Sequence, residues 1–103
     1  MEYTVVWSPA ASEDVESLAD YVARDSEFYA RAVVGKLLYA ARRLKDFPAS
    51  GRVVPELGDE SIRERFVYSY RLIYRLEANT VTILAVIHGK RLLDPLEERI
   101  RCS

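Results

Sequence analysis

Arginines, a lysine and a histidine that could do chemistry lie together between residues 62 and 91 of this 103-residue sequence. Six cationic side chains stand there against two glutamates, a local charge of +4 in a chain whose net charge is −1. Arginine binds phosphates and carboxylates through paired hydrogen bonds, and histidine has a pKa suited to proton transfer near neutral pH. The segment indicates a surface for a polyanion or an acidic partner. Its cations are Arg63, Arg65, Arg71, Arg75, Lys90 and Arg91, and its histidine is His88.

The segment 13–27 carries the opposite charge. Six carboxylates stand there against Arg24 alone, which gives a local charge of −5. The simplest interpretation of these acids is a solvated helix face.

The composition favours one globular domain that spans residues 1–103. Half of the residues are hydrophobic and 30% are charged, a balance that excludes a disordered chain. No apolar run approaches the roughly 18 residues of a membrane helix, and the first residues lack the features of a secretory signal. We therefore expect a cytoplasmic protein without membrane contact. One His and one Cys, Cys102, give no basis for a metal site, an internal disulfide or a cofactor.

The first half of the chain predicts a strand and then a helical hairpin. Tyr3, Val5 and Trp7 alternate with their neighbours, as in a strand with one buried face. Ser8 is a favoured N-cap and Pro9 fits the first helical position, so a helix begins here.

A second helix is predicted from a cap at Asp25-Ser26 to the breaker Pro48. The short connection predicts an antiparallel pair. Gly35 costs about 1 kcal/mol in a helix interior relative to alanine, and we interpret it as a point of close packing. A loop follows from Pro48 to Gly58. The apolar stripe of this helix comprises Phe28, Ala32, Val33, Leu37, Ala40, Ala41, Leu44 and Phe47.

The second half predicts three strands, 62–67, 70–77 and 80–87, which pair as an antiparallel meander. Asp94-Pro95-Leu96-Glu97 predicts the capped start of a short terminal helix. The fold class is therefore α+β, a small antiparallel sheet with an N-terminal helical hairpin packed on one face.

Two of the seven tyrosines are candidates for stacking on nucleic-acid bases, namely Tyr68 and Tyr70. The others that enter this argument occupy core-like positions: Tyr3, Tyr21, Tyr39 and Tyr74.

Five short segments occur in an order and spacing that carry a resemblance over almost the whole chain. They are Val6-Trp7-Ser8-Pro9-Ala10-Ala11, Leu44-Lys45-Asp46-Phe47-Pro48-Ala49-Ser50-Gly51-Arg52, Ile62-Arg63-Glu64, Tyr70-Arg71-Leu72-Ile73-Tyr74 and Val86-Ile87-His88-Gly89-Lys90-Arg91. Together they resemble the RelE/ParE superfamily of toxins from bacterial type II toxin-antitoxin systems, and within it the ParE-like, plasmid-stabilisation branch. The resemblance implies a toxin that is neutralised by a cognate antitoxin in a hetero-oligomer.

RelE-like members of the superfamily cut messenger RNA on the ribosome, which requires a general base, a general acid and cations for the developing charge. The resemblance implies Arg71, His88 and Arg91 as candidate catalytic residues, with Lys90 assisting. The sequence departs from RelE in two places. The tyrosine that follows the RelE arginine is replaced by the run 92–97, and the lysine pair before the second strand of RelE is replaced by the run 53–57.

ParE-like members are described as poisoning DNA gyrase, which needs no cleavage chemistry in the toxin itself and fits these missing residues better. We therefore expect a gyrase inhibitor that is not an enzyme. The alternatives are an endoribonuclease that acts on mRNA at the ribosome, and a non-toxic relic that only binds its antitoxin. The target-binding candidates are Arg63, Arg65, Arg71, Lys90 and Arg91.

Overall fold

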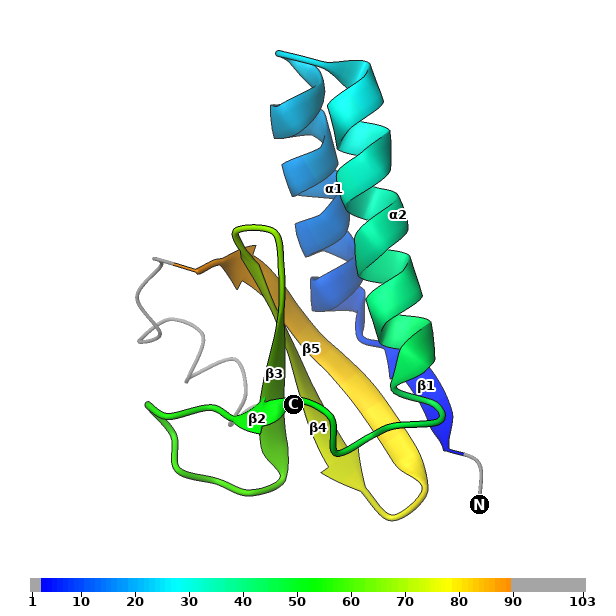
Figure 1. Cartoon of the computed structure of the whole chain (residues 1–103), viewed down its shortest axis with the longest axis vertical. Coiled ribbons are helices and arrows are strands. Elements are labelled where there is room, and N and C mark those ends of the chain that lie inside the picture. Colours follow the sequence, from blue (N-terminus) through cyan, green and yellow to red (C-terminus); the bar gives the residue numbers. More distant parts are fainter. Residues whose placement is uncertain (1–2, 90–103) are drawn as a thin grey trace.

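The computed structural model describes residues 3–89. The elements are β1 (Thr4–Trp7), α1 (Pro9–Ala23), α2 (Glu27–Arg43), β2 (Arg52–Val53), β3 (Ile62–Val67), β4 (Tyr70–Glu77) and β5 (Thr80–His88). The two helices lie side by side on one face of the sheet, and the tip that connects them projects beyond it (Figure 1). The predicted α+β fold is thereby confirmed, while the predicted terminal helix at Asp94 lies outside the described residues. Within these residues, no helix is both long and apolar enough to span a membrane.

The sheet has five strands in the order β1-β5-β4-β3-β2. Strands β2 to β5 pair with their neighbours in antiparallel fashion, but β1 pairs with β5 in parallel, from Thr4 opposite Thr80 to Trp7 opposite Ile83. The purely antiparallel sheet is therefore wrong at this edge. No hairpin joins β1 to β5, so local turn geometry does not set their relative direction. The predicted loop 48–58 also contains the two-residue strand β2.

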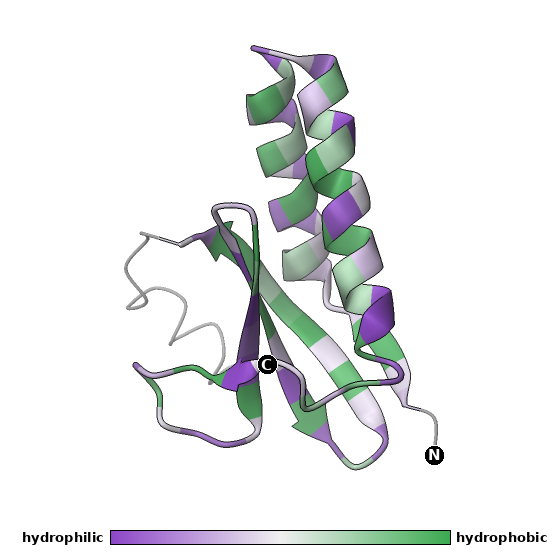
Figure 2. Ribbon diagram, viewed as in Figure 1, coloured by the Kyte–Doolittle hydropathy of each residue, from purple (hydrophilic) through white to green (hydrophobic). Residues whose placement is uncertain are grey.

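Apolar side chains form a core on each side of the sheet. The larger core lies between the helices and the sheet and includes Leu37, Leu44 and Tyr74, all fully buried. The smaller core lies on the opposite face and includes Ile62 and Ile73. Strand β5 contributes to both cores, as expected for a strand that is covered on two faces, and it is mostly apolar where β3 is strongly polar (Figure 2).

A β-bulge fixes the start of α1 to the sheet. The pairing of β5 with β4 shifts at Leu84. The Ser8 hydroxyl donates to the Leu84 carbonyl oxygen at 3.4 Å and accepts from Ala11 N at 3.1 Å. Asp14 Oδ2 accepts from Val86 N at 3.0 Å. The predicted cap at Ser8 is confirmed, and Asp14 has a structural contact instead of a purely solvated position.

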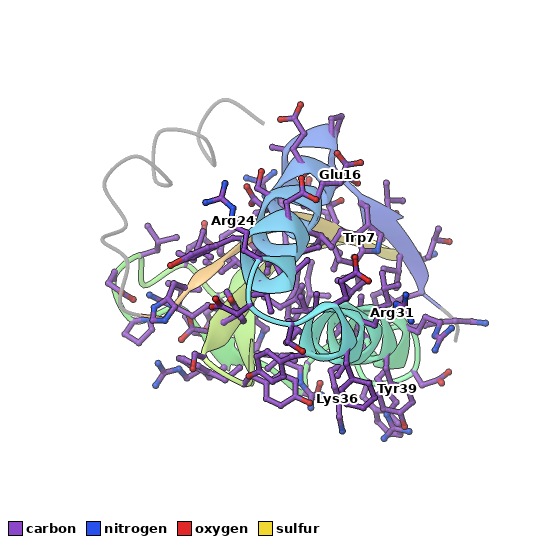
Figure 3. The ribbon with its side chains drawn as sticks, turned by 90° about the horizontal axis from the view of Figure 1, so that it is seen from above. Trp7, Glu16, Arg24, Arg31, Lys36 and Tyr39 are labelled. Carbon is purple, nitrogen blue, oxygen red and sulfur yellow. The ribbon has the colours of Figure 1, made fainter. Side chains whose placement is uncertain are left out.

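Several predicted core positions prove to be exposed. Phe28 and Tyr21 flank the hairpin tip, where the sheet no longer covers the helices, and both are exposed. Tyr39 is exposed because it projects from the flank of α2 that is turned away from α1 (Figure 3). Trp7 is only partly buried against the larger core. A Cβ atom at Gly35 would meet nothing within 4 Å, so Gly35 is no close-packing point.

Candidate functional site

Arg71 lies in a buried ionic network on the sheet face opposite the helices. Arg71 and Glu64 are 3% and 1% exposed. Arg71 Nε donates to Glu64 Oε1 at 2.6 Å, and its Nη1 and Nη2 atoms donate to the two carboxylate oxygens of Glu56 at 3.0 Å each. Arg52 Nε reaches the other Glu64 oxygen at 2.6 Å. We call these four residues the Arg71 network.

The Arg71 network holds its charges in place. The hydrogen bonds that Arg71 donates to Glu56, with a smaller contribution from those to Glu64, raise the pKa of Arg71, although burial opposes this. The hydrogen bonds that Glu56 accepts from Arg71 lower the pKa of Glu56. A buried ion pair requires this degree of mutual satisfaction, because an unpaired buried charge costs several kcal/mol. The Nε atom of Arg71 therefore contacts one carboxylate and its two Nη atoms contact another. Through these contacts Arg71 connects the 54–60 loop to β3 and β4.

Arg63 and Arg65 lie on the opposite, helix-covered side of β3. Arg63 Nη1 donates to the Gly51 carbonyl oxygen at 3.0 Å, and Arg65 Nη1 donates to Ser50 Oγ at 3.0 Å. Tyr74 supports the same loop, since its hydroxyl accepts from Gly51 N at 3.0 Å and donates to the carbonyl oxygen of the residue at position 48 at 2.8 Å. Burial raises the pKa of Tyr74, which keeps the hydroxyl protonated as a donor. Part of the predicted basic surface thus anchors a loop.

His88 ends β5 on the helix-covered side. It pairs with Tyr70, and the two rings meet edge to face with centroids 5.9 Å apart. Its side chain is exposed beside a hollow of about 410 Å³ that Tyr70 and Asp14 also line. Arg71 pairs with Ile87, one residue earlier on β5. Because successive strand residues point to opposite faces, His88 and Arg71 lie on different sides of the sheet.

The structure therefore separates the candidate catalytic and target-binding residues. Arg63 and Arg65 share one region, His88 another, and Arg71 is buried on the far face. Lys90 and Arg91 lie outside the described residues. Within residues 3–89, no group of three or more His, Cys, Asp or Glu side chains could hold a metal ion.

Sequence reasoning missed the carboxylates that bind Arg71. One signal was available, because Glu64 occupies the same strand parity as the apolar Ile62 and so faces a core. Sequence reasoning also missed a groove of about 480 Å³ between α1 and α2, whose lining is mostly apolar. Gly35 leaves one wall of this groove open. We call it the α1–α2 groove; its lining consists of Ala19, Asp20, Ala23, Glu27, Ala30, Arg31, Val34, Gly35 and Leu38.

Comparison with known proteins identifies the fold and the family. The structure is similar to one described as "Chromosomal ParDE TA system from P. aeruginosa", with a TM-score of 0.72 and 16% sequence identity over 86% of this chain and 98% of that chain. At this identity the likeness concerns the fold. No curated protein matches the chain. Residues 5–93 match the family described as the ParE toxin of the type II toxin-antitoxin system parDE. Because this match covers most of the sequence, the chain belongs to the ParE toxins of type II toxin-antitoxin systems.

Proposed function

We propose that this toxin acts by docking on DNA gyrase and not by cleaving RNA. The observation that carries this proposal is the state of Arg71, whose guanidinium is bound by Glu64 and Glu56. In-line RNA cleavage needs a cation and a proton-transfer group around one phosphate. Arg71 is committed to carboxylates, and His88 lies on the other side of the sheet. An inhibitor that acts by binding needs no such constellation.

In this proposal the candidate cations have different roles. Arg65, together with Lys90 and Arg91, contacts the target directly. Arg63 acts mainly by holding Gly51, and Arg71 acts by holding the 54–60 loop. Charged groups at the rim of an interface mainly affect the association rate and its salt dependence, so loss of one contact cation weakens inhibition without abolishing the fold.

Two assays of the purified toxin distinguish gyrase inhibition from RNA cleavage. One measures supercoiling by gyrase, and the other measures ribosome-dependent cleavage of mRNA. We expect inhibition of supercoiling without transcript cleavage. His88→Gln removes the near-neutral proton-transfer group and leaves supercoiling inhibition unchanged, whereas a ribonuclease would slow by roughly 10²-fold or more. Arg91→Ala weakens inhibition under either reading and serves as the positive control for loss. Transcript cleavage that His88→Gln abolishes in a folded protein would overturn the proposal, and inactivity in both assays would favour a non-toxic relic.

We also propose that an antitoxin segment binds in the α1–α2 groove. The groove combines an apolar floor with Asp20, Glu27 and Arg31 at its rim. A helix that lays its apolar face into such a groove is a common mode of peptide recognition. Gly35 supports this proposal, because an alanine there would be more stable in the helix and would meet no clash. The open position is consistent with a groove that must admit a partner.

Gly35→Leu tests the groove directly, since it fills the space without a buried clash. We expect the toxin to become more stable, because glycine in a helix interior costs about 1 kcal/mol. Capture of the protein encoded by the neighbouring gene should weaken at least tenfold in a pull-down with purified proteins. Arg42→Leu is the control, because it places the same side chain at an exposed site of α2 that does not line the groove. Unchanged capture by Gly35→Leu would place the antitoxin elsewhere.

A further inference from the structure

Three exposed tyrosines and two cations form a surface of which the proposals above use Arg65 alone. Tyr29, Lys36 and Tyr39 project from α2, and Arg65 and Tyr68 belong to β3 and the turn after it. Tyr29, Tyr39 and Tyr68 are 47%, 53% and 49% exposed. Lys36 and Tyr39 project from the same flank of α2, away from α1 (Figure 3). We call these five residues the α2–β3 surface.

Four residues of the α2–β3 surface line a hollow of about 320 Å³, and Tyr29 lies beside it against the ring of Tyr68. No residue that lines the hollow also lines the α1–α2 groove. The hollow is therefore separate from the groove proposed above for the antitoxin. The lining consists of Lys36, Tyr39, Ala40, Arg65, Phe66, Val67 and Tyr68.

Charge in the hollow is of one sign. Lys36 and Arg65 are cations, and none of the lining residues is a carboxylate. Arg65 donates one hydrogen bond to the Ser50 hydroxyl. This group is neutral, so it does not balance the positive charge of Arg65. This environment is complementary to a polyanion, in contrast to that of Arg71, which is closed by two glutamates.

Tyr68 is held in an unfavourable backbone conformation. Its φ angle is 54°, in the left-handed region that glycine adopts at little cost and other residues adopt at a cost of roughly 1 to 3 kcal/mol. The ring lies beside Tyr29, with centroids 5.9 Å apart and planes inclined by 58°. The two-residue turn would accept glycine, yet it carries an aromatic side chain that remains half-exposed. Strained residues of this kind are concentrated at binding sites.

We propose that the α2–β3 surface binds single-stranded nucleic acid. Bases stack on the exposed rings of Tyr39 and Tyr68, and the phosphates of the same strand pair with Lys36 and Arg65. Exposed aromatic rings interspersed with cations are the recurring design of such sites, because every base has a face that can stack. A duplex hides those faces, so the rings favour an unpaired strand. Stacking on a ring and pairing with a phosphate do not depend on the identity of the base, so the binding is independent of sequence.

The test measures fluorescence anisotropy of a labelled 15-nucleotide thymidine strand with the purified full-length chain. We expect a Kd of roughly 1 to 100 µM near 150 mM NaCl, the range of non-specific binding at physiological salt. Two phosphate contacts predict that affinity falls roughly sevenfold between 50 and 200 mM NaCl. A duplex of the same length and an abasic strand of the same length should each bind at least tenfold more weakly than the thymidine strand.

A matched pair of double variants locates the site. Lys36→Gln with Tyr39→Ala removes a cation and a ring three residues apart on α2, and should weaken binding at least tenfold. Arg24→Gln with Tyr21→Ala removes a cation and a ring at the same spacing near the end of α1, where Arg24 lies over the Tyr21 ring at 6.0 Å. This control should change affinity less than twofold.

Tyr68→Asn gives an independent measure, because asparagine tolerates the left-handed region but has no ring. We expect a loss of at least fivefold with an unchanged melting temperature, while Tyr68→Phe retains binding. The proposal fails if the two double variants weaken binding equally, if the abasic strand binds as well as the thymidine strand, or if no binding occurs below 1 mM. Loss of antitoxin capture with full oligonucleotide binding in the Lys36 and Tyr39 variant would instead make this surface a protein interface.

Discussion

Arg71 and Arg65 are both arginines in the same basic segment of sequence, yet their surroundings differ completely. Arg71 is buried and bound to Glu64 and Glu56, while Arg65 lies at a hollow that is lined by a second cation and no carboxylate. The difference arises from the face of the sheet on which each side chain lies, because Arg71 points to the face where the 54–60 loop supplies Glu56, and Arg65 points to the helix-covered face. The value of a cation for binding a polyanion therefore depends on which carboxylates share its face of the sheet, and not on the charge of the segment.

The largest effect expected from this comparison follows removal of the buried carboxylate. Glu64→Gln keeps the shape of the side chain but leaves Arg52 without its carboxylate partner and the buried Arg71 with Glu56 alone. We expect the free energy of unfolding to fall by about 3 kcal/mol in urea denaturation. Lys36→Gln is the control from the α2–β3 surface and should change stability by less than about 0.5 kcal/mol. Equal losses would remove the distinction between the two environments.

A second prediction concerns the backbone that holds Glu64 in register. A Cβ atom at Gly51 would lie 2.6 Å from both the Glu64 carbonyl oxygen and the Tyr74 hydroxyl. Gly51→Ala should therefore destabilise the protein by about 2 kcal/mol, since these atoms have no room to move. Gly35→Ala, where the added methyl meets nothing, should raise stability. The two midpoints in urea should shift in opposite directions, and a shared direction would contradict the tight contact at Gly51.

The third prediction compares Ala78 and Tyr68, which both have a positive φ angle but differ in the contacts of their side chains. Ala78 has a φ angle of 49° at the same position of its two-residue turn as Tyr68. Ala78→Gly should stabilise the protein by about 0.5 to 1 kcal/mol, measured by thermal unfolding, because it relieves the strain and loses little contact. Tyr68→Gly should gain less, since it also loses the contact with Tyr29. A larger gain at Tyr68 would show that its ring contributes nothing to the fold.

The smallest effect is a dependence on pH. Arg71 lowers the pKa of Glu56 from its ordinary value of 4.5, so the folded state favours the charged carboxylate. The stabilisation is present above this value and is lost as the pH falls through the lower folded pKa. Because Glu56 is half-exposed, we expect Glu56→Gln to cost only about 0.5 kcal/mol at pH 7. The difference in urea midpoint between the variant and the parent should shrink as the pH falls below 4.5. A difference that stays constant with pH would show that the ion pair is not its source.

The helices and most strands could be predicted from the sequence because their signals are local. Ser8 and Ser26 cap the two helices through side-chain oxygens that accept from Ala11 N and Tyr29 N. Strand-forming residues between two-residue turns place β3, β4 and β5. The strand β1 was predicted from its alternation, but its parallel pairing with β5 could not be, since the partner lies about 76 residues away and no turn relates them.

The candidate site was less predictable because it depends on register and coverage. The distance between the side chains of Arg71 and His88 follows from which residues of β4 and β5 face each other, and a shift of one residue would reverse the outcome. The exposure of Phe28 depends on how far the sheet extends beneath the helices, and the apolar stripe of the helix does not show this. The carboxylate partner Glu56 comes from a loop 15 residues before Arg71.

The pairing of β1 with β5 also determines when this toxin can form during synthesis. Ser8 makes its contact with Leu84 across 76 residues, so the first strand leaves the ribosome long before its partner exists. At roughly 5 to 20 residues per second, the delay is about 4 to 15 seconds. During that interval the helical hairpin can form, but the pairing of β1 with β5 and the bulge cannot. Each newly made chain is therefore incompletely folded, and on this account harmless, for the time needed to synthesise the 76 residues that separate Ser8 from Leu84.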